Sequence, residues 1–435
     1  MRALRFFIPF IFVIVIVSPS VAFAQAATDP AQLRQDIDQL RKEFDALKEQ
    51  YDQRLAALEA KLASVPGQQV QQVPAAPAPT QPAVEVPAGA AGAGGPTGAL
   101  PVYGAASAAS KVFNPDAAVI GNFLGAAGKN EVNPQPPLAI PESELSLQAI
   151  VDPYARADFF LAFGEEGVDL EEGFISFPTL PGGVLARVGK MRSAFGKVNT
   201  LHTHVLPWTD RPLATENLAG GEEGLTDAGI SVARLIPVPG LFLEATGQVF
   251  RGDAQDVFHS GKRGNLSYVG HLRAYQDITE SSNLDFGVSY ARGHNDAGLD
   301  DDDARFKTQL YGIDATFRWK PLQRAIYRSF VGRTEVFWSR REQPDALQKA
   351  IGFYLSGDYQ FGRRWFAGAR YDRSDRARDA SIFDTGQSLL LTYWPSEFSQ
   401  VRGQYRRTRY ADGPTANEFL FQFLFAIGAH GAHPF

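Results

Sequence analysis

Most of this chain alternates apolar and polar residues with a period of two, and this pattern constrains the fold most strongly. In the segment "EFLFQFLFAI", four phenylalanines from Phe419 to Phe425 fall on one parity, while Glu418 and Gln422 fall on the other. Successive side chains of a β-strand point to opposite faces of a sheet, so the pattern predicts strands with one apolar face. After residue 24 no run approaches about 18 consecutive apolar residues, which excludes helical membrane spans.

Aromatic residues near the ends of the alternating segments favour a membrane barrel over a soluble sandwich. Trp319, Trp338, Trp365 and Trp394 all lie at or near such ends. Both kinds of fold alternate, but a transmembrane barrel needs strands of about ten residues that are apolar outward and polar inward, with aromatic girdles at both interfaces. The indole N–H groups can then meet the lipid headgroups.

Sixteen alternating segments can be counted in a barrel domain that spans residues 112–435. They cover 117–125, 143–151, 153–163, 168–177, 184–193, 226–235, 240–250, 265–277, 284–294, 307–319, 328–340, 349–361, 364–373, 384–394, 398–408 and 415–427. Short links alternate with longer, more polar ones, as expected of periplasmic turns and outer loops. The sequence predicts an all-β fold, a 16-stranded antiparallel transmembrane β-barrel whose last strand pairs with its first, because lipid tolerates no unpaired edge.

Three segments precede the barrel. Residues 1–24 combine two arginines, an apolar run and an Ala-Phe-Ala step, which is typical of a secretory signal peptide. Residues 29–64 carry apolar heptads with opposite charges at g and e, which predicts a periplasmic coiled-coil helix that self-associates. Residues 65–111 are rich in Pro, Ala and Gly, which predicts a disordered linker. We therefore expect an exported protein of a Gram-negative outer membrane.

Composition excludes several other classes of function. The chain has no cysteine, which removes disulfides, thiolate nucleophiles and zinc–thiolate sites together. With a formal charge of −6, the chain lacks the excess of basic residues that is typical of proteins that bind nucleic acid. No pattern in the sequence indicates a bound cofactor, so we expect none.

The parity of the strands also predicts which residues line the lumen. Sixteen strands leave an aqueous channel, whereas eight would be filled by side chains. On the strand face that is expected to line the lumen there are nine carboxylates, at Glu144, Asp158, Glu244, Asp285, Asp314, Glu335, Asp358, Asp372 and Glu418. Arginine-rich rows predict a weak preference for anions. The basic residues expected to line the lumen are Arg156, Lys190, Arg192, Arg273, Arg318, Arg333, Arg370, Arg402 and Arg406.

The link from Ala194 to Leu225 is long enough to fold into the barrel and narrow the pore. A surface lid is the alternative, but in a barrel of this size we expect constriction. The candidate lining residues of this loop are Lys197, His202, His204, Asp210 and Arg211.

The segment "GKMRSAFGKVNTLHTHVLPWTDRPL" resembles the phosphate-selective porin family, also called porin O/P-like. In that family a strand ending in Gly-Lys leads through a Phe-Gly step to a loop with an Asp-Arg-Pro-Leu-like motif. The resemblance implies a trimeric outer-membrane channel for small anions or general solutes. The matching positions are Gly189-Lys190, Phe195-Gly196 and Asp210-Arg211-Pro212-Leu213.

These observations predict a porin that gives passive diffusion, and hence ion transport, to small hydrophilic solutes or ions. Its expected partners are the outer-membrane bilayer, two further copies of the chain through barrel and coiled coil, and peptidoglycan. A purely structural tether of the envelope is compatible with a pore. An energised receptor-transporter is disfavoured, because no folded plug domain precedes the barrel and the chain is too short for 22 strands.

Two alternatives rest on histidines. A metal-ion channel, for zinc, is suggested by His202 and His204 on the long loop and by His430 and His433 near the C-terminus. His202 and His204 project the same way on an extended segment, but the sequence identifies no third ligand, so no metal site is assigned. An outer-membrane barrel enzyme is suggested by His259-Ser260, a base beside a nucleophile. Neighbours in sequence are poorly placed for that hydrogen bond, and no complete triad emerges, so we expect no catalytic residues and no enzyme.

Overall fold

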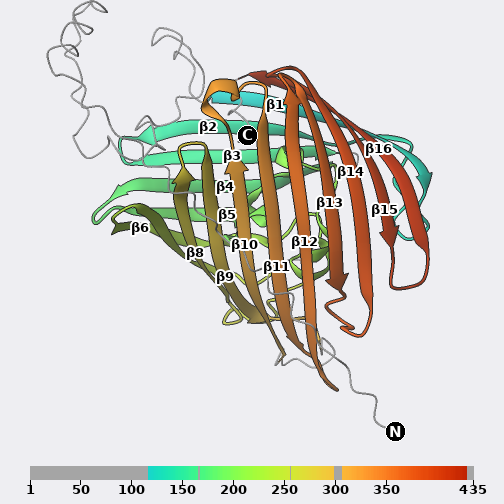
Figure 1. Ribbon diagram of the computed structural model, residues 1–435. Helices are drawn as coiled ribbons and strands as arrows, with labels where there is room; N and C mark the ends of the chain where they lie inside the picture. Colours follow the sequence, from blue (N-terminus) through green and yellow to red (C-terminus); the bar gives the residue numbers. More distant parts are fainter. Residues whose placement is uncertain (1–115, 165–166, 255, 298–305, 429–435) are drawn as a thin grey trace, which may run out of the picture. The chain divides into compact units, whose positions relative to one another are not determined.

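The computed structural model describes residues 116–164, 167–254, 256–297 and 306–428, whose strands close into one antiparallel barrel (Figure 1). Each strand pairs with the next in the sequence, and β16 pairs with β1. The strands are β1 Asp116–Lys129, β2 Leu138–Asp152, β3 Ala155–Gly164, β4 Gly167–Leu180, β5 Val184–Arg192, β6 Thr226–Val238, β7 Leu241–Phe250, β8 Ser267–Thr279, β9 Ser282–His294, β10 Lys307–Trp319, β11 Ser329–Glu342, β12 Leu347–Gly362, β13 Trp365–Asp375, β14 Phe383–Ser396, β15 Ser399–Arg409 and β16 Thr415–Gly428.

The prediction of a 16-stranded antiparallel barrel is confirmed, and each expected segment overlaps one strand. Closure is made as expected, with Phe423 of β16 opposite Phe123 of β1 in an antiparallel register. Because the barrel has no edge, every strand finds hydrogen-bond partners on both sides. The predicted signal peptide, coiled coil and linker, as well as His430 and His433, lie outside the described residues.

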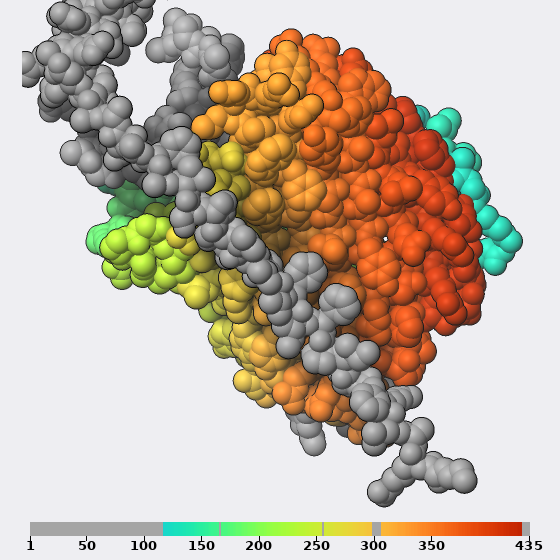
Figure 2. All heavy atoms as spheres, viewed as in Figure 1, coloured from blue at the N-terminus to red at the C-terminus, as the bar shows by residue number. Residues whose placement is uncertain are grey.

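The outer surface of the barrel is apolar. On β16 the residues of the phenylalanine parity are exposed, apart from the partly buried Phe423, with 54% for Phe419 and 63% for Ile427. Glu418 and Gln422 are buried toward the interior. β10 shows the same division, with Tyr311 exposed and its neighbours of the other parity buried. Figure 2 shows the wall that the later strands form. An apolar outer face on a closed sheet is what contact with lipid requires.

Within the part of the chain that the structure describes, four short helical segments lie between strands. They are η2 Val198–Thr200, η3 Thr203–Val205 and α2 Leu213–Leu218, all in the link from β5 to β6, and η4 Leu322–Arg324 between β10 and β11. Within the described ranges no helix is long and apolar enough to cross a membrane, a finding that concerns helices and not strands.

Buried apolar residues concentrate where the link from β5 to β6 meets the inner wall. One cluster joins Phe195 and Leu218 of this link to Phe337 of β11. A second joins Trp208 to Tyr354 of β12. Among the described residues, the packed core of the interior therefore lies along this link and beside the link from β7 to β8, and polar side chains cover much of the remaining inner wall.

Candidate functional site

The link between β5 and β6, residues 193–225, crosses the interior of the barrel (Figure 1). We call it the inner loop. Its polar contacts reach β9, β11, β13 and β15 on one side of the barrel order and β2 and β4 on the other. Strands so far apart in a closed sheet can be touched by one loop only across the lumen. Three groups of contacts hold the loop in place.

The first group ties the start of the inner loop to β9 and β11. Lys197 Nζ lies 2.5 Å from Asp285 Oδ2, and the backbone N–H groups of Lys197 and Val198 donate to Glu335 Oε1 at 2.5 and 2.9 Å. Gly196 has a φ of 63°, and an added Cβ would lie 3.0 Å from Glu335 Oε1. Glycine is therefore required here both by the left-handed backbone and by the close approach to the wall.

The second group centres on Asp210 and ties the middle of the loop to β13 and β15. Arg370 Nη2 lies 2.7 Å from Asp210 Oδ2, Arg406 Nη1 lies 3.0 Å from the same oxygen, and Gln404 Nε2 donates to Oδ1 at 2.6 Å. Burial would raise the pKa of Asp210, but the two guanidinium groups hold it well below its usual range. Asp210 is therefore ionised at neutral pH and serves as the shared partner of two buried cations.

Trp208 packs next to this ionic cluster and is fully buried. Its ring lies 5.2 Å from the ring of Tyr354 in an edge-on arrangement, and the Arg370 guanidinium carbon lies 4.9 Å from the indole centroid. The loop thus combines a cation–π contact with aromatic packing against the wall. These contacts hold the middle of the loop against the inner wall.

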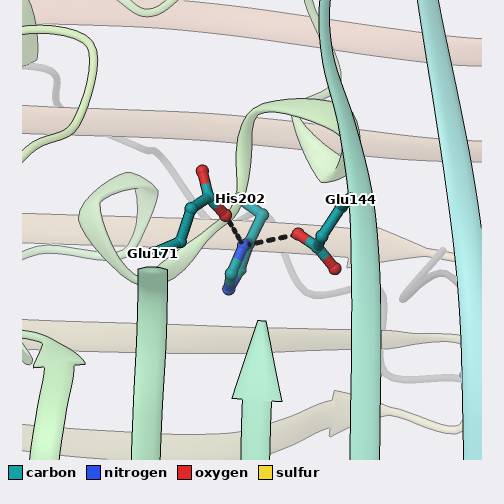
Figure 3. Close-up of side chains that lie close together, drawn as sticks. All are labelled: Glu144, Glu171 and His202. Atoms are coloured by element: carbon teal, nitrogen blue, oxygen red, sulfur yellow. Dashed lines mark hydrogen bonds and ion pairs between the residues drawn. The ribbon is translucent and has the colours of Figure 1, made fainter. Parts of the chain in front are cut away.

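The third group centres on His202 and ties the loop to β2 and β4 (Figure 3). His202 Nδ1 lies 2.5 Å from Glu171 Oε2 and 2.8 Å from Glu144 Oε2, and Nε2 lies 2.7 Å from Glu172 Oε2. His204 Nδ1 lies 3.5 Å from Glu144 Oε2. Burial would lower the pKa of His202, but the hydrogen bonds to the three carboxylates outweigh it and raise the pKa well above its ordinary value.

A β-bulge explains how two neighbouring glutamates reach one histidine. The register between β3 and β4 shifts so that Phe160 pairs with Glu172 while Leu161 pairs with Leu170. Glu171 is therefore the extra residue of the bulge, and it escapes the alternation that would point it away from the side chain of Glu172.

A cavity of about 680 Å³ borders the inner loop on the side of β1 to β6, with Arg406 of β15 and Leu420 of β16 also in its lining. Carboxylates outnumber basic groups in its lining. The charged lining residues are Glu142, Asp169, Glu171, Asp210, Glu216, Glu222 and Glu223 on the acidic side and Lys190, Arg192, Arg211 and Arg406 on the basic side.

The five candidate residues of the inner loop have different positions. Lys197 belongs to the first group, Asp210 to the second, and His202 and His204 to the third. Arg211 donates to three backbone carbonyls of the loop itself, at 2.5 to 3.2 Å, and so braces its conformation. Asp210 and Arg211 also border the cavity, whereas Lys197 and the two histidines do not line it.

The basic residues assigned to the lumen are mostly paired with carboxylates. Arg402 differs, because it donates to the Leu206 carbonyl at 3.0 Å and to Gln422 Oε1 at 2.8 Å. Charge that is neutralised within the wall attracts passing anions less than free arginines would. The pairs are Arg156–Asp158, Lys190–Asp169, Arg192–Glu171, Arg273–Asp285, Arg318–Asp285, Arg333–Asp358, Arg370–Asp210 and Arg406–Glu418.

Sequence reasoning did not identify Glu171, Glu172, Gln404 or Trp208 as parts of the site. Glu171 and Glu172 do leave a signal, because two adjacent carboxylates interrupt the alternation of their strand. Trp208 and Gln404 leave none, since their importance depends on a loop whose path across the barrel has no sequence period.

A closed barrel of sixteen antiparallel strands with a loop folded inside is a porin-type barrel. An anion-selective porin from Comamonas acidovorans shares this fold, with a TM-score of 0.52 and 12% identity over 72% of this chain and 99% of that one. The outer membrane channel DcaP of Acinetobacter baumannii matches 72% of this chain and 96% of its own, with a TM-score of 0.49 and 11% identity.

No family model matches the chain. An uncharacterized protein of Aquifex aeolicus (strain VF5) is 33% identical over 333 residues, which cover 67% of this chain and 69% of the relative. The chain belongs to the same family as that Aquifex protein.

Proposed function

We propose that the protein is an outer-membrane porin through which small hydrophilic solutes and ions diffuse passively. The observation that carries the proposal is a closed 16-stranded barrel with an apolar outer face, a polar inner face and a loop folded across its interior. An apolar exterior requires lipid, and a polar interior of this width holds water. The inner loop is then the constriction, and the cavity beside it is part of the path for solutes.

We also propose that the pore has a weak preference for anions. The resemblance to phosphate-selective porins and the arginine rows of the inner face support this preference. The pairing of most arginines with carboxylates, and the acidic lining of the cavity, argue for weak discrimination rather than a dedicated anion site.

Purified protein is expected to insert into planar lipid bilayers and conduct ions in discrete steps, because the inner face is hydrated. Single-channel recording in KCl tests this, with detergent alone as the control. Reversal potentials in a KCl gradient then report the selectivity. The pore hypothesis would be contradicted if inserted protein never produced a conductance step although heat-modifiable migration showed it to be folded.

The selectivity is expected to depend on pH near neutrality through Glu216 of α2, which borders the cavity. Burial, together with nearby Asp210, raises the pKa of Glu216 to about 7. Lowering the pH from about 8 to about 6 protonates Glu216, removes one of the negative charges of the cavity and shifts the reversal potential toward anions. Glu216→Gln is expected to reduce this shift, whereas Asn217→Ser on the same helix keeps it. Equal shifts in both variants would exclude Glu216 as the titrating group.

We propose a homotrimer whose N-terminal coiled coil lies in the periplasm and reaches toward peptidoglycan. The heptads over residues 31–63 and their complementary charges support self-association. The signal peptide at residues 1–24 supports export.

We also propose that the chain is not an enzyme. The Ser260 hydroxyl donates to the backbone carbonyl of Lys262 at 3.2 Å, and His259 Nδ1 lies 3.8 Å from Asp253 Oδ1. Both side chains of the His259-Ser260 pair are thus directed at other groups, so this pair offers no activated nucleophile.

A further inference from the structure

The three carboxylates around His202 outnumber the protons that its ring can share. Nδ1 faces two carboxylate oxygens at once, Glu171 Oε2 at 2.5 Å and Glu144 Oε2 at 2.8 Å (Figure 3). Nε2 faces Glu172 Oε2 at 2.7 Å. An imidazole nitrogen carries at most one hydrogen, so one proton on Nδ1 must serve both oxygens. When Nε2–H donates to Glu172, the neutral ring presents a lone pair to two anions. The position between Nδ1 and the two oxygens therefore suits a cation, which is either the Nδ1 proton of an imidazolium or a metal ion that replaces this proton.

We propose that Glu144, Glu171 and His202 form a binding site for one divalent transition-metal ion of the Zn²⁺ type. The three ligand atoms lie within 4.8 Å of one another. One imidazole nitrogen and two carboxylate oxygens are ligands that suit Zn²⁺, and two carboxylates neutralise its charge. The site stands apart from the proposed diffusion of solutes, because it joins the loop to the wall whatever the pore conducts.

Glu172 has the position that a supporting residue takes in metal sites. A histidine that binds a metal through one ring nitrogen usually donates its other N–H to a carboxylate, which fixes the tautomer and the ring orientation. Glu172 is 2.7 Å from Nε2, and its other oxygen accepts the backbone N–H of Arg192 at 2.7 Å. The ring is thus held with Nδ1 directed at the two ligand carboxylates.

Little movement separates the present arrangement from a filled site. With bonds of about 2.0–2.2 Å, tetrahedral ligand atoms lie about 3.3 Å apart. The ring therefore has to withdraw from Glu144 and Glu171 by less than about 1 Å. Glu171 borders the water-accessible cavity, which offers a route for the ion and for a water ligand, and His204 lies close enough to Glu144 to supply a further nitrogen.

Zinc binding to the purified full-length protein, first stripped with a chelator, tests the proposal. Equilibrium dialysis with metal analysis is expected to show one ion fewer per chain for His202→Ala than for the wild type. His271→Ala is the matched control, because His271 is also an inner-wall histidine but contacts Ser289 at 2.8 Å. Using the difference between variants removes the contribution of other histidines.

The supporting residue provides the sharper variant. Glu172→Gln is expected to keep the stoichiometry and weaken zinc binding by about 10–100-fold, since it loosens the ring without removing a ligand. If His202→Ala fails to fold, as judged by heat-modifiable migration, the conservative variant Glu172→Gln still tests whether the metal site exists. Unchanged zinc affinity in Glu172→Gln, or equal zinc content in the wild type and His202→Ala, would overturn the proposal. Displacement of Zn²⁺ by equimolar Ca²⁺ would overturn the assignment to the Zn²⁺ type.

Discussion

Asp210→Ala is expected to lower the free energy of unfolding by about 3 kcal/mol, at the lower end of the 3–5 kcal/mol that follows the loss of one partner of a buried ion pair. Arg370 and Arg406 both lie within 3.0 Å of Asp210 Oδ2, and the Arg370 side chain is almost completely buried. Asp372 and Glu418 remain as their partners in the variant, which limits the loss. Urea unfolding in lipid vesicles, followed by heat-modifiable migration, measures the change.

The contribution of Asp210 to the free energy of unfolding is expected to decrease at low pH. The folded-state pKa of Asp210 is lowered, because the guanidinium groups outweigh burial. The stabilisation is therefore fully present above the unfolded pKa and is lost as the pH falls toward the folded pKa.

Asp169→Ala is the matched control for Asp210→Ala, since the ion pair of Asp169 with Lys190 is 3.4 Å long and the Asp169 side chain is 66% exposed. The control is expected to lose at most about 1 kcal/mol. Equal losses in the two variants would show that Asp210 does not organise the loop.

Replacing residues 199–222 with a short Gly/Ser linker is expected to raise the single-channel conductance several-fold. The loop crosses the lumen, and sixteen strands enclose a much wider water-filled channel without it. Arg192 and Thr226 are opposite each other at the ends of β5 and β6, so a short linker can join the strands without changing the pairing. Conductance in planar bilayers gives the measurement.

A matched control shortens another link that also contributes to the buried cluster. Residues 253–264 lie between β7 and β8 and include Phe258, which packs in the same cluster as Phe195. This link contacts β9, Arg341 of β11 and Arg378 of the link between β13 and β14, but none of its described residues lines the cavity. Its shortening is expected to change the conductance far less. If both deletions give the wild-type conductance, the inner loop is not the constriction.

Individual residues show how far the sequence reaches into the site. Parity alone placed Arg370, Arg406 and Glu144 on the inner face, because a strand offers only two directions for its side chains. The same rule could not place Glu171, since a bulge cancels the alternation at that point. The sequence also singled out His202 but supplied no third ligand, which the fold brings from β2 and β4.

The sequence by itself determined the barrel: the number of strands, their order and, away from the bulges, the face that a residue presents. These features follow from a local period of two and from the requirement that lipid leave no backbone group unpaired. Only the tertiary structure decided the path of residues 193–225 and the partners of Lys197, Asp210 and His202. The physical reason is that a loop has no repeating pattern, so its position depends on ion pairs and packing with strands that are up to about two hundred residues away in the chain.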